Sequence, residues 1–322
     1  MTEVNVTLTG TGTPVPVPGR AGPGVFVQTP DTGIQIDTGR STVLRLAEAG
    51  LRADEIDAVL LTHHHSDHTT DLGDVLVSAW LMDAEHSVAV VTPDGLTADF
   101  ARLALEPLQG DLLFRRSHRG VRRIAEPELL TFQPSSDPQE VWRRGSTRVD
   151  AVAVRHEPVL AAAGYRIATP VGNVVVSGDT RACDEVERLA AEARVLVHEV
   201  VDPQRVPDHR QHTIDYHARP DEVAALAERA GVDVLALTHL WPSPEHDGHV
   251  EDLLAAVRGG GFTGDLIVGS DLTAIRFDSH HTSITVPDRP AVGVQGRHSP
   301  ATPSRAAAAP SSPVVFTTPE TP

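Results

Sequence analysis

The sequence predicts a layered α/β protein in which β-sheets lie inside and helices cover them. Three observations support this prediction. Short runs rich in valine and isoleucine, bounded by turn residues, recur along residues 1 to about 278. Segments with helical amphipathicity alternate with these runs after an initial cluster of strands. The chain has 322 residues and 40 % hydrophobic content, enough for one large domain or two small ones.

The expected strands are short apolar runs in which β-branched residues dominate. Turn residues separate them, which favours strands over buried helix segments. In chain order they cover residues 4–8, 24–29, 33–37, 57–62, 87–92, 148–154, 163–168, 173–178, 194–199, 233–238, 265–270 and 273–277.

The expected helices occupy the amphipathic segments between these strands. Pro220 suits the first turn of a helix, and Asp221 and Glu222 suit the positive end of its dipole. The predicted helices cover residues 41–49, 70–82, 97–108, 183–192, 220–230 and 250–257.

The character of the chain changes after about Asp278. Residues 279–322 are rich in proline, alanine, serine and threonine and show no periodicity, so we expect a disordered tail. Its histidines, His280, His281 and His298, are not expected to belong to a site. The predicted folded domain is therefore residues 1–278.

Composition narrows the setting and the class of protein. The single cysteine, Cys183, allows no disulfide framework and favours a cytoplasmic location. We expect no signal peptide, because the start lacks a basic and an apolar region, and no membrane span, because no apolar run approaches 18 residues. The formal net charge of −17 argues against broad nucleic-acid binding.

The densest chemical signal is "LLTHHHSDHTTD", residues 60–71. It lies between a predicted strand that ends at Thr62 and a predicted helix, so its side chains can converge on one place. If the backbone is still extended, alternation points His63 and His65 the same way and His64 elsewhere. Asp67 and His68 follow the bend and can face a second point nearby.

Three later residues complete a candidate metal site. His156, Asp179 and His239 each follow an apolar predicted strand, where sites in layered α/β proteins gather. Imidazoles and carboxylates suit zinc, iron or manganese. Seven such residues suggest two metal ions, with Asp179 as the natural bridge between ions about 3.5–4 Å apart.

These motifs carry a family resemblance over nearly all of residues 1–278. Beside the histidine run stand "GTGTP" (10–14), "IDTG" (36–39), "HEPVLAAAGYRI" (156–167), "SGDT" (177–180), "HEVV" (198–201), "YHARPDEVAAL" (216–226) and "LTH" (237–239). The chain resembles the metallo-β-lactamase superfamily and, within it, the ribonuclease Z-like branch. The resemblance implies a four-layer αββα sandwich, two divalent metal ions, with zinc favoured over manganese or iron, and a homodimer.

The resemblance also assigns roles to individual residues. His63, His65 and His156 would bind one metal, Asp67, His68 and His239 the other, with Asp179 bridging. Asp37 would orient ligand histidines. His217, partnered by Glu199, would contact the scissile phosphate or protonate the leaving group, and Asp67 could steer the proton of a metal-bridging hydroxide.

The implied activity is phosphodiester hydrolysis of the ribonuclease Z type. Its substrate is either RNA at a 3′ end or a small phosphodiester, because the family's long transfer-RNA-gripping arm is missing. The stretch "GYRIATPVGNVVVSGDT" leaves room only for a hairpin turn at "TPVGN". An arylsulfatase- or lactonase-like hydrolase is the alternative that keeps the same site.

A basic patch could contact a phosphate backbone. It lies in "FRRSHRGVRRI", residues 114–124, and its arginines are Arg115, Arg116, Arg119, Arg122 and Arg123. An exposed, solvated connector explains the same pattern. A non-enzymatic nucleic-acid-binding protein would use this patch, but the seven metal-ligating candidates would then have no purpose.

Overall fold

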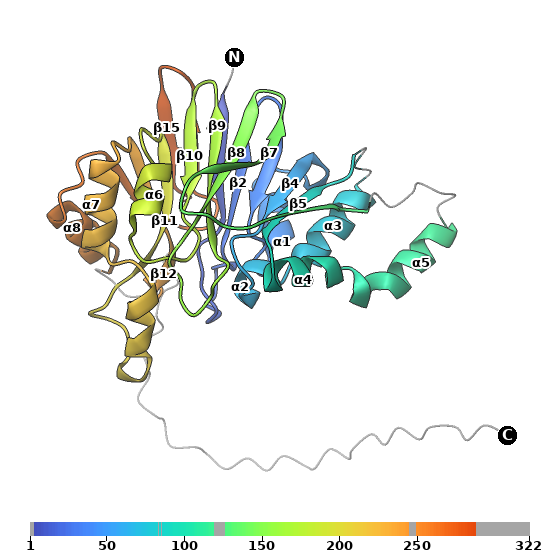
Figure 1. The fold of residues 1–322 in the computed structure, drawn as a ribbon, viewed down its shortest axis with the longest axis horizontal. Coiled ribbons are helices and arrows are strands. Elements are labelled where there is room, and N and C mark those ends of the chain that lie inside the picture. Colours follow the sequence, from blue (N-terminus) through green and yellow to red (C-terminus); the bar gives the residue numbers. More distant parts are fainter. Residues whose placement is uncertain (1–2, 83, 85, 119–125, 245–248, 288–322) are drawn as a thin grey trace, which may run out of the picture. The chain divides into compact units, whose positions relative to one another are not determined.

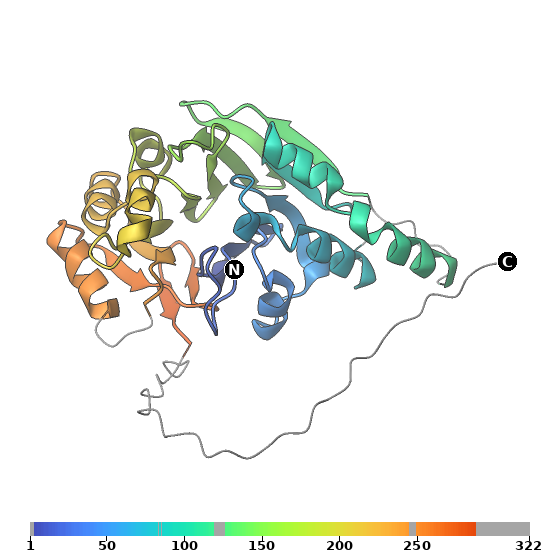
Figure 2. The same ribbon diagram turned by 90° about the horizontal axis from the view of Figure 1, so that it is seen from below.

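A computed structural model describes residues 3–82, 84, 86–118, 126–244 and 249–287. Two β-sheets face each other, and helices cover the outer face of each (Figures 1 and 2). The four-layer αββα sandwich expected from the sequence is therefore confirmed.

The first sheet has eight strands, with a parallel half and an antiparallel half. The pairs from β3 to β6 are parallel, whereas those joining β15, β14, β1, β2 and β3 are antiparallel. In spatial order the strands are β15 (Thr282–Thr285), β14 (Ala274–Phe277), β1 (Val4–Gly10), β2 (Gly24–Gln28), β3 (Gly33–Ile36), β4 (Ile56–Leu60), β5 (Ala89–Pro93) and β6 (Glu128–Phe132).

The second sheet has seven strands and the same mixed character. Pairs from β10 to β13 are parallel, and those from β7 to β10 are antiparallel. In spatial order they are β13 (Asp265–Val268), β12 (Val234–Trp241), β11 (Val195–Val201), β10 (Gly172–Val176), β9 (Ala163–Thr169), β8 (Thr147–Ala153) and β7 (Gln139–Arg144). Only Pro170 and Val171 separate β9 from β10, so the predicted hairpin turn is confirmed.

Helices pack on the outer face of each sheet. The first sheet carries α1 (Thr42–Glu48), α3 (Leu72–Leu81) and α4 (Leu96–Leu103). The second carries α6 (Asp184–Leu189), α7 (Pro220–Arg229) and α8 (His249–Gly259). Two further helices complete the chain order: α2 (Ser66–Thr69) directly precedes α3, and α5 (Gln109–His118) follows α4. No helix of the described residues is long and apolar enough to cross a membrane.

Strand alternation explains why the molecule has three apolar layers. On β11, Val195 and Val197 belong to the core between the two sheets, while Leu196 between them belongs to the core under α6 and α7. β4 alternates in the same way: Leu60 points between the sheets and Val59 points toward the helices α1 and α3. Because successive side chains of a strand point to opposite faces, strands covered on both faces read as continuous apolar runs.

The structure adds elements that the sequence pattern did not predict. Strands β6, β7 and β15 and helices α2 and α5 fall outside the expected ranges. Strand β15 pairs with β14, Ile284 opposite Ile275, so folded structure continues past Asp278, where we expected the tail to begin. The exposed His280 and His281 join no group of clustered ligand atoms; the rest of the expected tail, residues 288–322 with His298, lies outside the described residues.

A buried aspartate fixes the loop between β1 and β2. Asp271 Oδ1 accepts hydrogen bonds from the backbone N–H and the hydroxyl of Thr11, at 3.0 and 2.9 Å. Its Oδ2 accepts from the N–H of Ala21 at 2.7 Å and from Arg45 Nε at 2.8 Å. A single carboxylate therefore ties both ends of this loop to helix α1 and to the turn before β14.

Replacing Asp271 with asparagine is expected to lower the free energy of unfolding by about 2–4 kcal/mol, because it leaves buried donors without a charged acceptor. The matched control is Glu48→Gln, since Glu48 pairs with the same Arg45 but its side chain is 48 % exposed, against 0 % for Asp271. That change should cost less than about 1 kcal/mol. Urea unfolding of the full chain measures both values, and equal losses would contradict the assignment.

Candidate metal centre

The histidine run begins where β4 leaves the first sheet. The backbone is non-helical from His63 to His65 and then enters the short helix α2. His63 and His65 therefore project before the bend, and Asp67 and His68 project from the helix. His63, Asp67 and His68 are buried, whereas His65 is half-buried.

The second sheet brings three more side chains to the same place. His156 follows β8, Asp179 follows β10, and His239 lies on β12, where its backbone has a positive φ of 45°. Gly178 permits the close approach before Asp179: its φ is +62°, and a Cβ there would meet the Thr62 side chain at 2.9 Å. The two sheets thus touch directly beneath the cluster.

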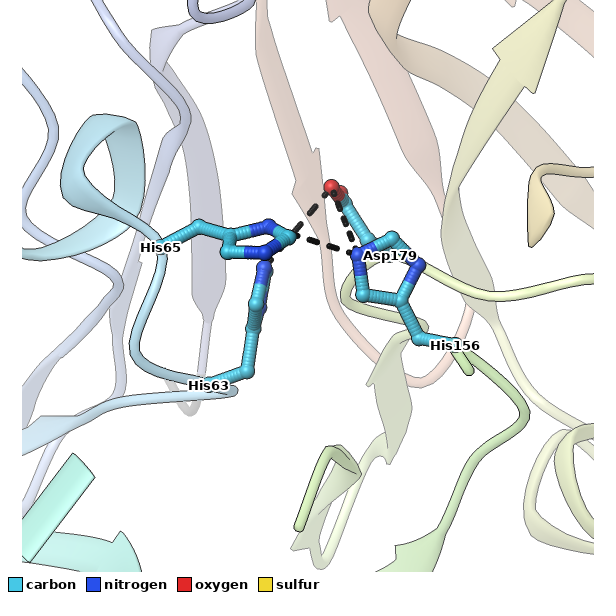
Figure 3. Close-up of side chains that lie close together, drawn as sticks. All are labelled: His63, His65, His156 and Asp179. Carbon is cyan, nitrogen blue, oxygen red and sulfur yellow. Dashed lines mark hydrogen bonds and ion pairs between the residues drawn. The ribbon is translucent and has the colours of Figure 1, made fainter. Parts of the chain in front are cut away.

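Among the described residues, the clustered ligand atoms form three overlapping groups, two of which divide the seven residues expected from the sequence, while the third joins Asp179 and His239 to His217. His63, His65, His156 and Asp179 each offer an atom within 4.8 Å of the others (Figure 3). Asp67, His68 and His239 form a second group by the same measure. The histidine run therefore divides between the first two groups as its spacing predicts, and His64 belongs to no group found among the described residues.

Asp179 lies between the two groups. Its Oδ2 is 3.9 Å from His63 Nε2 and 3.8 Å from His156 Nε2 in the first group. The same oxygen is 3.4 Å from His68 Nε2 and 3.3 Å from His239 Nε2 in the second. One carboxylate oxygen thus faces both sets of ring nitrogens.

Protein groups contact the outward nitrogens of three of the histidines, His63, His68 and His156. His68 Nδ1 donates to Asp37 Oδ2 at 2.7 Å, and His156 Nδ1 donates to the carbonyl of Tyr216 at 3.1 Å. Asp37 also accepts from the N–H and hydroxyl of Thr62, and that hydroxyl lies 3.0 Å from His63 Nδ1. Asp37 has a positive φ of 54°, a costly backbone state that persists only where the surroundings enforce it.

Five ligand atoms that face the cluster have no hydrogen-bond partner among the described residues. They are His63 Nε2, His68 Nε2, His239 Nε2, Asp67 Oδ2 and Asp179 Oδ1. Buried polar atoms without partners are costly, and a set of them facing one place fits a bound ion. Imidazoles with their outward nitrogens fixed, combined with carboxylates, form a donor set for divalent transition metals.

The charges of the cluster also favour a cation. Burial, with the neighbouring imidazoles, holds the pKa of His63 well below its usual value and lowers the pKa of His65 to about 4. Burial opposes ionisation of Asp179, but His239 and His68 outweigh it and hold its pKa well below normal. Burial also opposes a charged His68, yet Asp179, Asp67 and Asp37 raise its pKa well above normal. His63 and His65 are thus neutral and Asp179 is ionised, as metal binding requires, whereas His68 would release its proton when an ion binds.

A second charged pair lies beside the cluster. His217 Nδ1 is 2.8 Å from Glu199 Oε1, and both side chains are buried. Burial disfavours the protonated ring, but the charge and hydrogen bond of Glu199 outweigh it and raise the pKa of His217 to about 9. The ring centroid of His217 is 5.3 Å from that of His156 and 5.5 Å from that of His239. A proton held on His217 therefore lies next to one histidine of each ligand group, His156 of the first and His239 of the second.

The basic patch is only partly described. Arg115 and Arg116 lie on α5, where Arg115 pairs with Asp111 at 2.7 Å and Arg116 is exposed. Arg119, Arg122 and Arg123 lie outside the described residues. Arg115 and Arg116 do not line the cavities around the ligand cluster.

One feature of the site was missed from the sequence. A cavity of about 330 Å³ opens above the cluster, and its outer wall is the 3₁₀ segment Asp208–Tyr216 together with Trp241. The segment "DHRQHTIDYH" holds two further histidines, His209 and His212, just before His217. This repetition of histidines is the sequence signal that could have identified the segment as the wall of the cavity.

A family comparison now identifies the chain. Residues 32–240 match the family model described as "Beta-lactamase superfamily domain". The chain belongs to this superfamily. Ribonuclease Z of Mycobacterium bovis strain BCG / Pasteur 1173P2 is 35 % identical over 84 % of this chain and 96 % of its own length. Ribonuclease Z of Mycobacterium sp. strain KMS is 36 % identical, over 84 % and 94 %. The chain is a metal-dependent hydrolase of the ribonuclease Z type.

Solved structures support the fold. The metallo-beta-lactamase fold protein YhfI from Bacillus subtilis is 21 % identical with a TM-score of 0.67, covering 86 % of this chain and all of its own. Human tRNase Z, short form, is 19 % identical with a TM-score of 0.63, covering 84 % of this chain and 98 % of its own. The metallo-β-lactamase fold implies divalent metal ions, in agreement with the two His/Asp groups.

Proposed function

We propose that the chain hydrolyses phosphodiester bonds of RNA or of small nucleotides with two zinc ions. His63, His65 and His156 would hold one ion, and Asp67, His68 and His239 the other. Asp179 would bridge them, since its Oδ2 faces both groups. Asp37 would orient His68 through the 2.7 Å hydrogen bond. When bound, the ions would lower the pKa of water toward neutrality and neutralise charge on phosphate oxygens.

The residues of the chain would divide the remaining work. Asp67, at the second group, would accept or steer the proton of the attacking water. His217 would donate a proton to the leaving oxygen, and Glu199 would keep that proton on the ring. This pair is the single observation that favours a phosphodiester over an aryl sulfate, because an alkoxide leaving group needs a proton and a phenolate hardly does. A lactone also releases an alkoxide, so the substrate panel decides that case.

Two features bear on the choice of substrate. The relatives named ribonuclease Z favour RNA as the substrate, and we propose processing at an RNA 3′ end as the activity. The short β9–β10 turn and the net charge of −17 remove two usual means of gripping a long nucleic acid. We therefore propose that contacts close to the scissile bond dominate substrate binding. We also propose that the reaction takes place in the cytoplasm. Three expectations from the sequence stay predictions. They are the homodimer, the disorder of the tail beyond residue 287 and the phosphate contacts by the basic patch.

Metal removal and a substrate panel test this proposal. Chelation should abolish hydrolysis of bis(p-nitrophenyl) phosphate, and zinc should restore it better than manganese or iron. The panel would also contain an aryl sulfate and a lactone, measured as kcat/KM on the same preparation, with metal content determined by elemental analysis. Full activity after chelation would refute the metal role. Strong sulfatase or lactonase activity without phosphodiester turnover would replace the substrate class.

A further inference from the structure

The cavity above the ligand cluster has a wall suited to a flat ring. Its volume of about 330 Å³ is at the lower end for small-molecule sites. His65, His156 and Asp179 form part of its lining, as do Tyr216 and Trp241. A molecule whose phosphate reached the cluster would therefore place its next group against these aromatic rings.

Trp241 is held in a fixed orientation within this wall. Its indole Nε1 donates to Thr213 Oγ1 at 3.1 Å, and the guanidinium carbon of Arg210 lies 5.5 Å from its ring centroid. The side chain is half-buried, and it lines both this cavity and a neighbouring one of about 420 Å³. A tryptophan oriented by a hydrogen bond, with open space beside it, presents a ring that a ligand can reach.

We propose that Trp241 forms a subsite for the base of the nucleotide whose phosphate lies at the metal cluster. Arg210, stacked over the indole, places positive charge where a phosphate-bearing ligand enters. Stacking is the fitting chemistry, because each nucleobase has a flat face and an aromatic side chain accepts any of them. This inference rests on the proposed function, but it concerns recognition of the base and not cleavage.

The subsite addresses how a strongly acidic chain recognises a nucleotide. The net charge is −17, so long-range attraction cannot supply the affinity. Stacking of one base on an aromatic side chain tightens binding roughly fivefold to a hundredfold. Trp241 therefore sets affinity for the base, whereas the metal cluster holds the phosphate.

The test compares two ligands that differ only in the base. Adenosine 5′-monophosphate and ribose 5-phosphate are titrated calorimetrically into the metal-loaded full chain. The nucleotide should bind about tenfold more tightly, as expected for one stacked base. In Trp241→Ala the ratio should fall below about twofold, with ribose 5-phosphate affinity and metal content unchanged. Trp241→Phe should keep most of the preference.

Tryptophan fluorescence provides an independent readout if Trp241→Ala folds poorly. The chain has three tryptophans, and Trp80 on α3 lies outside the lining of the cavity, so it supplies the matched control. The nucleotide should quench emission in the wild type and in Trp80→Phe, but not in Trp241→Phe. Equal binding of the two ligands, or a preference that survives Trp241→Ala, overturns the subsite.

The same preparations separate the subsite from the proposed function. Hydrolysis of bis(p-nitrophenyl) phosphate without any preference for the base refutes the subsite alone. A Trp241-dependent preference in a protein without phosphodiesterase activity refutes the proposed function alone. A trinucleotide then distinguishes the source: tighter binding than the mononucleotide supports a base within an RNA strand, and equal binding supports a small nucleotide.

Discussion

Replacing His65 with alanine is expected to remove bound metal and lower kcat/KM for bis(p-nitrophenyl) phosphate by more than about a hundredfold, since changes even beyond the direct ligands cost 10–100-fold. Replacing the adjacent His64 with alanine should leave the metal content and kcat/KM within about twofold of the wild-type values. The reason is geometric: His65 belongs to the first ligand group, whereas His64 belongs to no group in the described part of the chain. Elemental analysis and steady-state kinetics on both variants provide the measurement.

The two variants control for each other. Both remove one imidazole from the same segment, and both side chains are half-buried, so a general effect on folding should appear in both. Loss of metal in His64→Ala, or retention of full activity in His65→Ala, would show that the division of the histidine run is wrong.

The second large effect is expected for His217→Ala and depends on the leaving group. For a dinucleotide, whose leaving oxygen is a poorly stabilised alkoxide, kcat should fall about 10²–10⁴-fold, as is typical on loss of a general acid. For bis(p-nitrophenyl) phosphate the fall should be less than about tenfold, because p-nitrophenolate leaves without a proton. Metal content should not change.

Glu199→Gln should repeat this pattern in weaker form, because it removes the charge that keeps the proton on His217. The diagnostic quantity is the ratio of the two kcat losses. If His217→Ala slowed both substrates equally, His217 would act in binding or in structure and not as a proton donor.

The sequence predicts central strands better than edge strands, and the reason is burial. The predicted strands include each strand that has neighbours on both sides in the two sheets. The three that were missed, β6, β7 and β15, are all sheet edges. β7, "QEVWRR", is half-exposed and rich in charge, and β15 is mostly exposed. One exposed face and one open edge remove the continuous apolar run on which recognition of a buried strand depends.

The candidate site follows the same logic. Five of its seven clustered residues lie near the end of an apolar strand or in the segment after one, and Asp67 and His68 follow in the same histidine run, so local patterns were enough to find them. Trp241 and Arg210 gave no comparable signal, since a tryptophan at the end of a strand is usually part of a core. Their position depends on how the 3₁₀ segment Asp208–Tyr216 folds back over the cluster, and no local periodicity encodes that contact.

The clustered residues come from both halves of the sandwich. The histidine run follows β4 of the first sheet, whereas His156, Asp179 and His239 belong to the second. Neither half can offer both ligand groups alone, so the site exists only once the sheets have docked. An ion bound there selects the assembled state over the unfolded chain, and its binding free energy adds to the stability of the fold. The catalytic centre would thus also fasten the two sheets together.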